Sequence, residues 1–335
     1  MVTPTSRRAF LMGRRIAATP FEQFCARLER TCLGSVRTAP ANAHSAETAQ
    51  AWLKPVRQED VAHARALCQE YRVALRLEGR EQPAVRTQAT LWVSPQPAGA
   101  TLSLVDSSTG VWRADAGCTV AQLQETWIFD GLKLAPDLTL AQWFAWPADG
   151  PAAASLNALR LIERAEVLLA DGTVEVLGPF GATAQAPLRS LTVQRMVPKL
   201  FELASSDSAQ RCAQVVPWPA GYRLDALMAN AAHEPNLAQL LFAHRGNLGW
   251  VQALWLKRPS SVLDPKGLPL DTVRAPEREQ VSTPPFETGT SGQTGCQPAT
   301  ISQLASHLDQ ELKHILDPLG VFGSNSILKG LESAS

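Results

Sequence analysis

The stretch Leu161 to Val176, LIERAEVLLADGTVEV, decides the fold class. Residues Leu161 to Leu169 are rich in Leu, Ile and Val and indicate a β-strand, and Asp171-Gly172 is a pair typical of a tight hairpin turn. Thr173 to Val176 then forms the returning strand. The stretch predicts an antiparallel hairpin, and the helix and strand patterns on either side of it predict a mixed α+β fold.

Further strands are predicted where short apolar runs end at turn residues, at Val73 to Leu77, Leu91 to Ser94, Thr101 to Val105, Val111 to Ala116 and Trp250 to Leu256. Helices are predicted where apolar residues recur at helical spacing, after Gln58-Glu59-Asp60, from Thr119 onward, over 237–242 and from Ile301 to Ile315. We divide the chain into an N-terminal helix and linker (1–47), one domain (48–258), a linker rich in Pro, Ser, Thr and Gly (259–300) and a C-terminal helix with its tail (301–335).

Composition excludes several classes of protein. The 335 residues are 45% hydrophobic, and 31 basic side chains balance 31 acidic ones. A chain without excess positive charge lacks the field that nucleic-acid binding needs, and no run of about 18 apolar residues predicts a transmembrane segment. The six cysteines are widely separated, which favours reduced thiols in the cytoplasm.

The N-terminus resembles an export signal only in part. Ser6 to Met12, SRRAFLM, is similar to the twin-arginine signature, but Arg14 and Arg15 follow directly and charges interrupt the segment Phe21 to Arg30. We therefore expect a short amphipathic helix, packed on the protein or on a partner, and a cytoplasmic location, either free or peripheral to the inner membrane.

No common motif for nucleotide phosphates, zinc peptidases or serine hydrolases is present. Several weaker blocks nevertheless follow one another in a characteristic order, namely Trp52-Leu53-Lys54-Pro55, 116–123 (AGCTVAQL), 131–136 (GLKLAP), 166–172 (EVLLADG), 220–228 (AGYRLDALM), 241–251 (LFAHRGNLGWV) and 312–322 (LKHILDPLGVF). In this order they resemble the FAD-binding PCMH-type family of vanillyl-alcohol oxidase and p-cresol methylhydroxylase, and within it the FAD-binding subunit of glycolate oxidase.

The resemblance implies a fold, a cofactor and a reaction. It implies two α+β subdomains with FAD between them, hydride transfer from a small 2-hydroxy acid to the flavin, and assembly with an iron-sulfur or other oxidase subunit. The positions that it assigns to cofactor binding are Arg76, Gly79, Gly117, Pro136, Asp137, Gly221, Tyr222, Arg245, Gly246, Asn247 and Leu248. It assigns no catalytic residue and no metal.

This chain departs from the family at both glycine-rich loops. The first is replaced by Arg76-Leu77-Glu78-Gly79-Arg80-Glu81 and the second by 140–147, LAQWFAWP, with bulky side chains in place of glycine. Glycines are needed in such loops because the backbone must approach the phosphates closely. Only 77 residues follow Arg258 (335 minus 258), so a full cap domain does not fit and we expect a truncated or missing one.

Two functions remain open at this point. The chain is either an FAD-linked oxidoreductase or a catalytically inactive pseudoenzyme that serves as a structural or interaction subunit. The same choice applies to single residues. Trp143 and Trp146 either close over a pocket or fill it as core, and His244 and Arg245 either contact an anion or face solvent. Asp137 and Tyr222 have either a flavin contact or a purely structural role.

Overall fold

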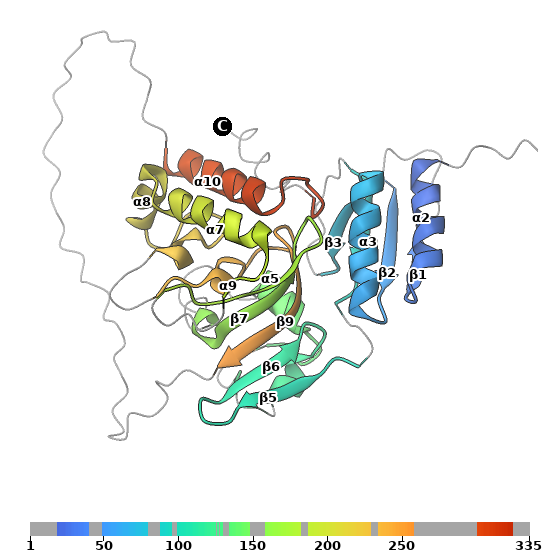
Figure 1. The fold of residues 1–335 in the computed structure, drawn as a ribbon, viewed down its shortest axis with the longest axis horizontal. Helices are drawn as coiled ribbons and strands as arrows, with labels where there is room; N and C mark the ends of the chain where they lie inside the picture. Colours follow the sequence, from blue (N-terminus) through green and yellow to red (C-terminus); the bar gives the residue numbers. More distant parts are fainter. Residues whose placement is uncertain are drawn as a thin grey trace, which may run out of the picture.

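The computed structural model describes residues 19–39, 49–79, 88–95, 99–124, 126, 128–129, 134–147, 158–181, 187–228, 234–257 and 300–323. They form two sheets with helices packed on each (Figure 1). The first sheet contains β1 (Ser35–Thr38), β2 (Gln50–Lys54), β3 (Ala74–Leu77) and β4 (Thr90–Val93) in the order β1-β2-β4-β3. β4 is parallel to both β2 and β3, whereas β1 pairs with β2 in the antiparallel direction.

Two helices pack beside the first sheet. Thr19 and Glu22 form a capping box at the start of α2 (Pro20–Thr31), which buries Phe24 and Leu28. α3 (Gln58–Tyr71) has acidic residues in its first turn, where they complement the helix dipole. α2 packs against α3 and β1, so the predicted amphipathic helix does pack on the body of the protein.

The second sheet is entirely antiparallel. It contains β5 (Leu102–Asp106), β6 (Val111–Asp115), β7 (Ile162–Leu168), β8 (Val174–Leu177) and β9 (Trp250–Lys257) in the order β5-β6-β9-β7-β8. The predicted hairpin is confirmed as β7 and β8. Its turn contains Gly172 at φ +94°, a left-handed conformation that favours glycine, and the Thr173 amide donates to Asp171.

The remaining helices connect and cover this sheet. They are α4 (Val120–Gln124), α5 (Leu140–Ala145), α7 (Leu191–Ala204), α8 (Asp207–Ala213), the 3₁₀ turn η1 (Leu224–Leu227), α9 (Leu237–Leu240) and α10 (Ile301–Leu316). α7, α8 and α10 pack together at the end of the molecule away from α2 and α3 (Figure 1).

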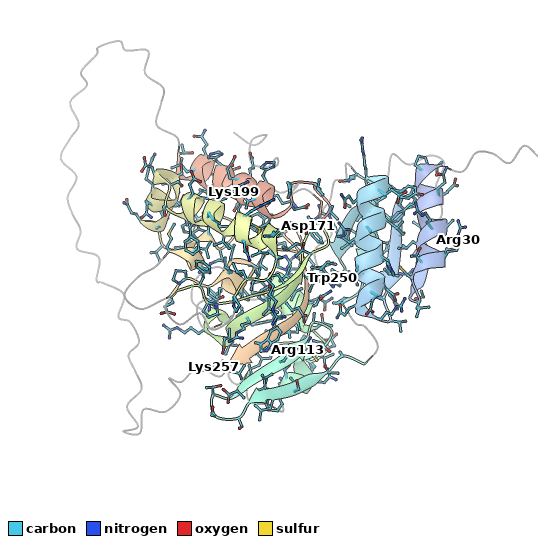
Figure 2. All side chains as sticks on the ribbon, in the orientation of Figure 1. Arg30, Arg113, Asp171, Lys199, Trp250 and Lys257 are labelled. Atoms are coloured by element: carbon cyan, nitrogen blue, oxygen red, sulfur yellow. The ribbon has the colours of Figure 1, made fainter. Side chains whose placement is uncertain are left out.

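Hydrogen bonds join the two halves at several places, of which two involve α3 and the segment after α10. Arg65 of α3 donates through Nη1 to the carbonyl oxygen of Ala170 in the β7–β8 turn at 2.6 Å, and Figure 2 places the neighbouring Asp171 at the border between the halves. The segment after α10 returns to the first sheet, where the Leu75 amide donates to the carbonyl oxygen of Val321 at 2.8 Å. Because β3 is an edge strand, this bond uses a backbone group that the sheet leaves unpaired.

The fold agrees with the predicted mixture of helices and sheets. β1 lies within the predicted N-terminal segment yet pairs with β2 beyond residue 48, while the domain boundaries themselves stay a prediction. Cys25, Cys32, Cys68, Cys118 and Cys212 are buried free thiols. None of the described helices combines the length and apolarity that crossing a bilayer needs. The arginine-rich start, Cys296 and the predicted linker up to residue 299 lie outside the described residues.

Candidate functional site at the junction of the two sheets

The loop that follows β3 is the first part of the predicted cofactor site. After Leu77, the Glu78 amide donates to the carbonyl oxygen of Val93, and the chain reaches Gly79. A Cβ atom built at Gly79 would lie 2.2 Å from Cζ3 of Trp146, so the indole ring packs directly on this glycine. The surface of Gly79 that the resemblance assigns to a phosphate is therefore covered by a side chain of the same protein. Arg80 and Glu81 lie outside the described residues.

The helix α5 contains most of the segment 140–147, which the resemblance aligns with the second glycine-rich loop. Thr139 and Gln142 form a capping box at its start, and the Gln142 side-chain amide also donates to the carbonyl oxygen of Glu78 at 3.0 Å. Trp143 is buried, with its ring centroid 4.9 Å from that of Phe129. Trp143 thus belongs to an aromatic core with Phe129 and Phe242, whereas half-buried Trp146 packs on the loop after β3.

The turn before β9 has an unusual backbone. Ala243, Arg245 and Gly246 all have positive φ, at 63°, 54° and 71°. Such a turn can bind an anion only if its amides are free. The amides of Ala243 and Arg245 instead donate to the last carbonyl oxygens of α5, and the Asn247 amide donates to the carbonyl oxygen of His244. A Cβ atom at Gly246 would lie 3.1 Å from Cβ of Leu77, so this glycine permits close packing on β3.

Polar side chains lock the turn to β3 and α10. Arg76 donates to Oδ1 of Asn247 at 3.0 Å, and Lys313 donates to the carbonyl oxygen of the same residue. Lys313 also donates to Asp317 at 2.6 Å, and Asp317 accepts from the amides of Val321 and Phe322. Burial lowers the pKa of Lys313, although Asp317 opposes that shift. Arg76 and Lys313, two cations near the predicted site, thus already have partners within the protein.

His244 and Arg245 have different environments. His244 is buried, its Nδ1 has no hydrogen-bond partner, and its ring lies 5.7 Å from that of Phe144. Burial, and then the charge of Lys313, lowers the pKa of His244 to about 3, so the imidazole is neutral near pH 7. Arg245 is exposed. The solvent-facing alternative is therefore correct for Arg245 and wrong for His244, and a neutral His244 brings no positive charge to an anion.

The remaining predicted positions do not meet at this junction. Gly221 and Tyr222 donate their amides to the two carboxylate oxygens of Asp309 on α10, at 2.8 and 2.9 Å. Pro136 and Asp137 form an exposed turn, Gly117 is buried after β6, and Leu248 is a core residue. Of the predicted set, the structure brings together Arg76, Gly79, Gly246 and Asn247.

The described residues do not fit a dinucleotide diphosphate. Trp146 covers Gly79, Leu77 packs on Gly246, and the amides of Ala243 and Arg245 donate to α5. A phosphate at this place would have to displace an indole ring and break main-chain hydrogen bonds without replacing them. No group of three or more acidic, histidine or cysteine side chains is arranged for a metal ion within the described ranges.

Comparison with solved structures gives distant likenesses. No protein-family model and no curated protein matches the chain. Two crystal forms of alkyldihydroxyacetonephosphate synthase are similar at 13% identity, with TM-scores of 0.37 and 0.36. Each match covers 63% of this chain and 32% of the synthase, so this chain spans about a third of that protein. At this level neither the activity nor the ligand of the synthase transfers to this chain.

Sequence reasoning missed the residues that hold the junction together. Lys313 and Asp317 come from the C-terminal helix, far along the chain from Asn247, and no local pattern links them. A usable signal was the Asp317-Pro318 pair after an amphipathic helix, because a carboxylate there can accept from the amides of a following turn. Trp146 was singled out for its size, but its contact with Gly79 is visible only in three dimensions.

Proposed function

We propose that this chain is a catalytically inactive protein on an FAD-type scaffold, which binds no dinucleotide and acts as a structural or interaction subunit. The observation that carries the proposal is the contact of the Trp146 indole with Gly79. The hydrogen bond from Gln142 to Glu78 and the use of the turn amides by α5 support it further. The resemblance to the glycolate oxidase subunit suggests an iron-sulfur or other oxidase subunit as the partner.

The alternative is a flavin enzyme that oxidises a small 2-hydroxy acid. Its support is the order of the sequence blocks. It would require the Trp146 ring to leave Gly79 and the residues near Arg76 and Lys313 to exchange their present partners for phosphate. A hydroxy-acid oxidase also needs an acceptor for the hydroxyl proton and a cation for the carboxylate, and neutral, buried His244 supplies no cation.

The test is thermal denaturation with increasing FAD. A ligand of the native state must raise the melting temperature, by an amount corresponding to about 2.7 kcal/mol at a hundred times its Kd. We expect no shift for the wild-type protein. Trp146→Ala opens the covered face of Gly79, and Trp52→Ala is the matched control because Trp52 is a similarly half-buried indole on β2, stacked with Arg37.

Each outcome bears on the proposal. FAD stabilisation of Trp146→Ala, but not of the wild type or Trp52→Ala, would identify the indole as the block. If FAD raises the melting temperature of neither the wild type nor a variant, the protein binds no flavin, but the role given to Trp146 is contradicted. A clear shift of the wild type would overturn the proposal in favour of the flavin enzyme.

A further inference from the structure

A groove of about 850 Å³ lies at the other end of the second sheet from the junction. β9 begins with Trp250 beside the junction and ends with Lys257 at the groove, roughly 23 Å further along a strand of this length. The groove is lined by Val105, Asp106, Thr109, Val111, Arg160, Ile162, Glu163, Arg164, Val176, Gly178, Pro179, Phe180, Pro187, Leu188, Asn236, Leu237, Trp255 and Lys257. Its volume is within the range of small-molecule sites.

One wall of the groove is held rigidly by main-chain and side-chain hydrogen bonds. The Phe180 amide donates to the carbonyl oxygen of Pro235 and the Leu237 amide to that of Gly178. Asn236 is buried, accepts from the Ala238 amide at 2.8 Å and donates to the carbonyl oxygen of Glu163 at 3.1 Å. A wall built in this way exists before any ligand arrives, which lowers the entropic cost of binding.

Some of the charged side chains in the groove have hydrogen-bond or ion-pair partners, and others have none. Asp106 accepts from the amide and hydroxyl of Ser108 and from Thr109, and these bonds lower its pKa to about 2. Glu163 lies 3.7 Å from Arg164, which makes a loose ion pair. Within the described part of the chain, the side chains of Arg160 and Lys257 have neither a hydrogen-bond nor an ion-pair partner. Although Asp106 and Glu163 also line the groove, it therefore offers two cations that form no ion pair with a described residue.

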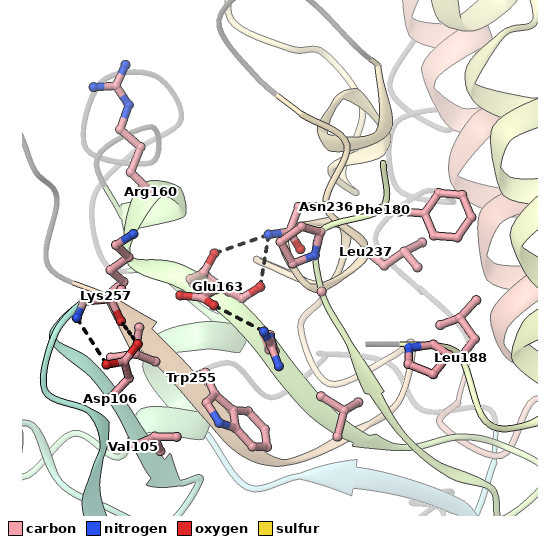
Figure 3. A pocket seen from close by; sticks show the side chains of 18 residues that line it. Val105, Asp106, Arg160, Glu163, Phe180, Leu188, Asn236, Leu237, Trp255 and Lys257 are labelled. Atoms are coloured by element: carbon pink, nitrogen blue, oxygen red, sulfur yellow. Dashed lines mark hydrogen bonds and ion pairs between the residues drawn. The ribbon is translucent and has the colours of Figure 1, made fainter. Parts of the chain in front are cut away.

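Apolar and cationic side chains occupy different sides. Figure 3 shows Arg160 and Lys257 on one side, with Asp106 and Val105 near Lys257. Phe180, Leu188 and Leu237 lie on the other side, and Trp255 lies on the strand below them. Phe180 is 38% exposed, so part of its ring is available for contact. A ligand that satisfies both sides must combine an anionic head with an apolar body.

From this division we infer that the groove binds small amphipathic carboxylates, with the carboxylate at Arg160 and Lys257 and the hydrocarbon against Phe180 and Leu188. A carboxylate is favoured because charge-assisted hydrogen bonds to arginine and lysine are stronger than neutral ones. Aromatic or linear hydrocarbon chains of about six to nine carbons are of the size that the groove accommodates. The inference goes beyond the proposed function and does not depend on whether flavin binds, because the junction is at the opposite end of β9.

The experiment is calorimetric titration of the full chain with 3-phenylpropionate and with octanoate. 3-Phenylpropionamide removes only the charge, and propionate removes only the apolar body, so each should bind at least tenfold more weakly. Arg160→Gln and Lys257→Met should each lower the affinity for both carboxylates by about tenfold. Lys199→Met is the matched control, because Lys199 is an exposed cation on α7, away from Lys257 (Figure 2).

The outcomes separate this ligand class from others. Binding that falls in the two groove variants and is unchanged in Lys199→Met supports the inference. No binding of either carboxylate, equal binding of the amide, or equal affinity in all three variants would overturn it. Binding of an acidic peptide such as hexaglutamate in place of the carboxylates would also overturn it and would assign the groove to a protein partner. Unchanged melting temperatures would confirm that the variants are folded.

Discussion

At the scale of single residues, Asp60 shows how one buried carboxylate organises a loop. Its oxygens accept from the amides of Leu33, Gly34 and Val56, each at 3.0 Å, and from Arg57 at 3.3 Å. Burial alone would raise the pKa of Asp60, but the donated hydrogen bonds outweigh it and hold the pKa below its ordinary value. This side chain therefore connects the end of α2, β1 and the start of α3.

We predict that Asp60→Asn lowers the free energy of unfolding by about 2–3 kcal/mol, because the amide accepts through only one atom and leaves a buried N–H without a partner. The wild-type contribution should be complete above the ordinary aspartate pKa and be lost as the pH falls through the lowered folded-state value. Urea denaturation at several pH values measures both effects. Asp137→Asn, in an exposed turn, should change stability by less than about 0.5 kcal/mol. Equal stability of the two variants at pH 7 would refute the role given to Asp60.

Single residues also explain why the candidate site was only partly predictable. The loss of glycine around Gly79 and in 140–147 is visible in the sequence, and it predicts a poor fit for phosphate. The sequence does not indicate that Trp146 rather than Trp143 would cover Gly79, because that depends on where α5 ends. It also gave no reason to expect a neutral, buried His244 beside an exposed Arg245.

At the scale of elements, α10 is tied to the rest of the protein by Asp309. This buried carboxylate accepts from Gly221 and Tyr222, and burial raises its pKa to about 6, even though the two backbone hydrogen bonds and the charge of Arg245 lower it. The folded state therefore prefers the protonated carboxyl group more than the unfolded state does.

The raised pKa of Asp309 predicts a pH dependence opposite in sign to that of Asp60. The stability that Asp309 contributes should be complete below its unfolded pKa, near 3.9, and should be lost as the pH rises through about 6, by on the order of 2–3 kcal/mol. Asp309→Asn cannot titrate and should lack this loss. Denaturant midpoints between pH 4 and pH 7 measure the difference, and parallel curves for the two proteins would show that the carboxyl group does not titrate in this range.

The helices and strands were predicted correctly where the sequence pattern that specifies them spans only a few residues. The helix after Gln58 and the strands around the Asp171-Gly172 turn form as their spacing indicates, because acidic first-turn residues and turn pairs act within a few residues. α7 was not predicted although Val193, Met196, Val197 and Leu200 share a buried face, since Pro198 lies inside the helix and interrupts the usual helical pattern. β1 pairs with β2 across the intervening residues 40–48, and no short-range sequence pattern predicts this pairing.

At the scale of the whole molecule, the two halves depend on a few polar contacts. We predict that Arg65→Met lowers the free energy of unfolding by about 1–3 kcal/mol, because the carbonyl oxygen of Ala170 loses its buried donor. Amide hydrogen exchange should accelerate in the β7–β8 turn near Gly172, against which the Arg65 guanidinium packs. Arg30→Met, which removes an exposed arginine on α2, should leave both measurements unchanged. Equal stability and exchange in the two variants would show that the halves are joined by other contacts.

The central claim is that the scaffold fills its own dinucleotide site. The most direct test is the absorbance spectrum of the intact purified chain, expressed in flavin-sufficient cells and incubated with excess FAD before gel filtration. The account predicts a colourless protein without the flavin band near 450 nm that any bound oxidised flavin would give. Co-elution of about one flavin per chain would contradict it, because the Trp146 ring could not then be packed on Gly79 as the structure has it.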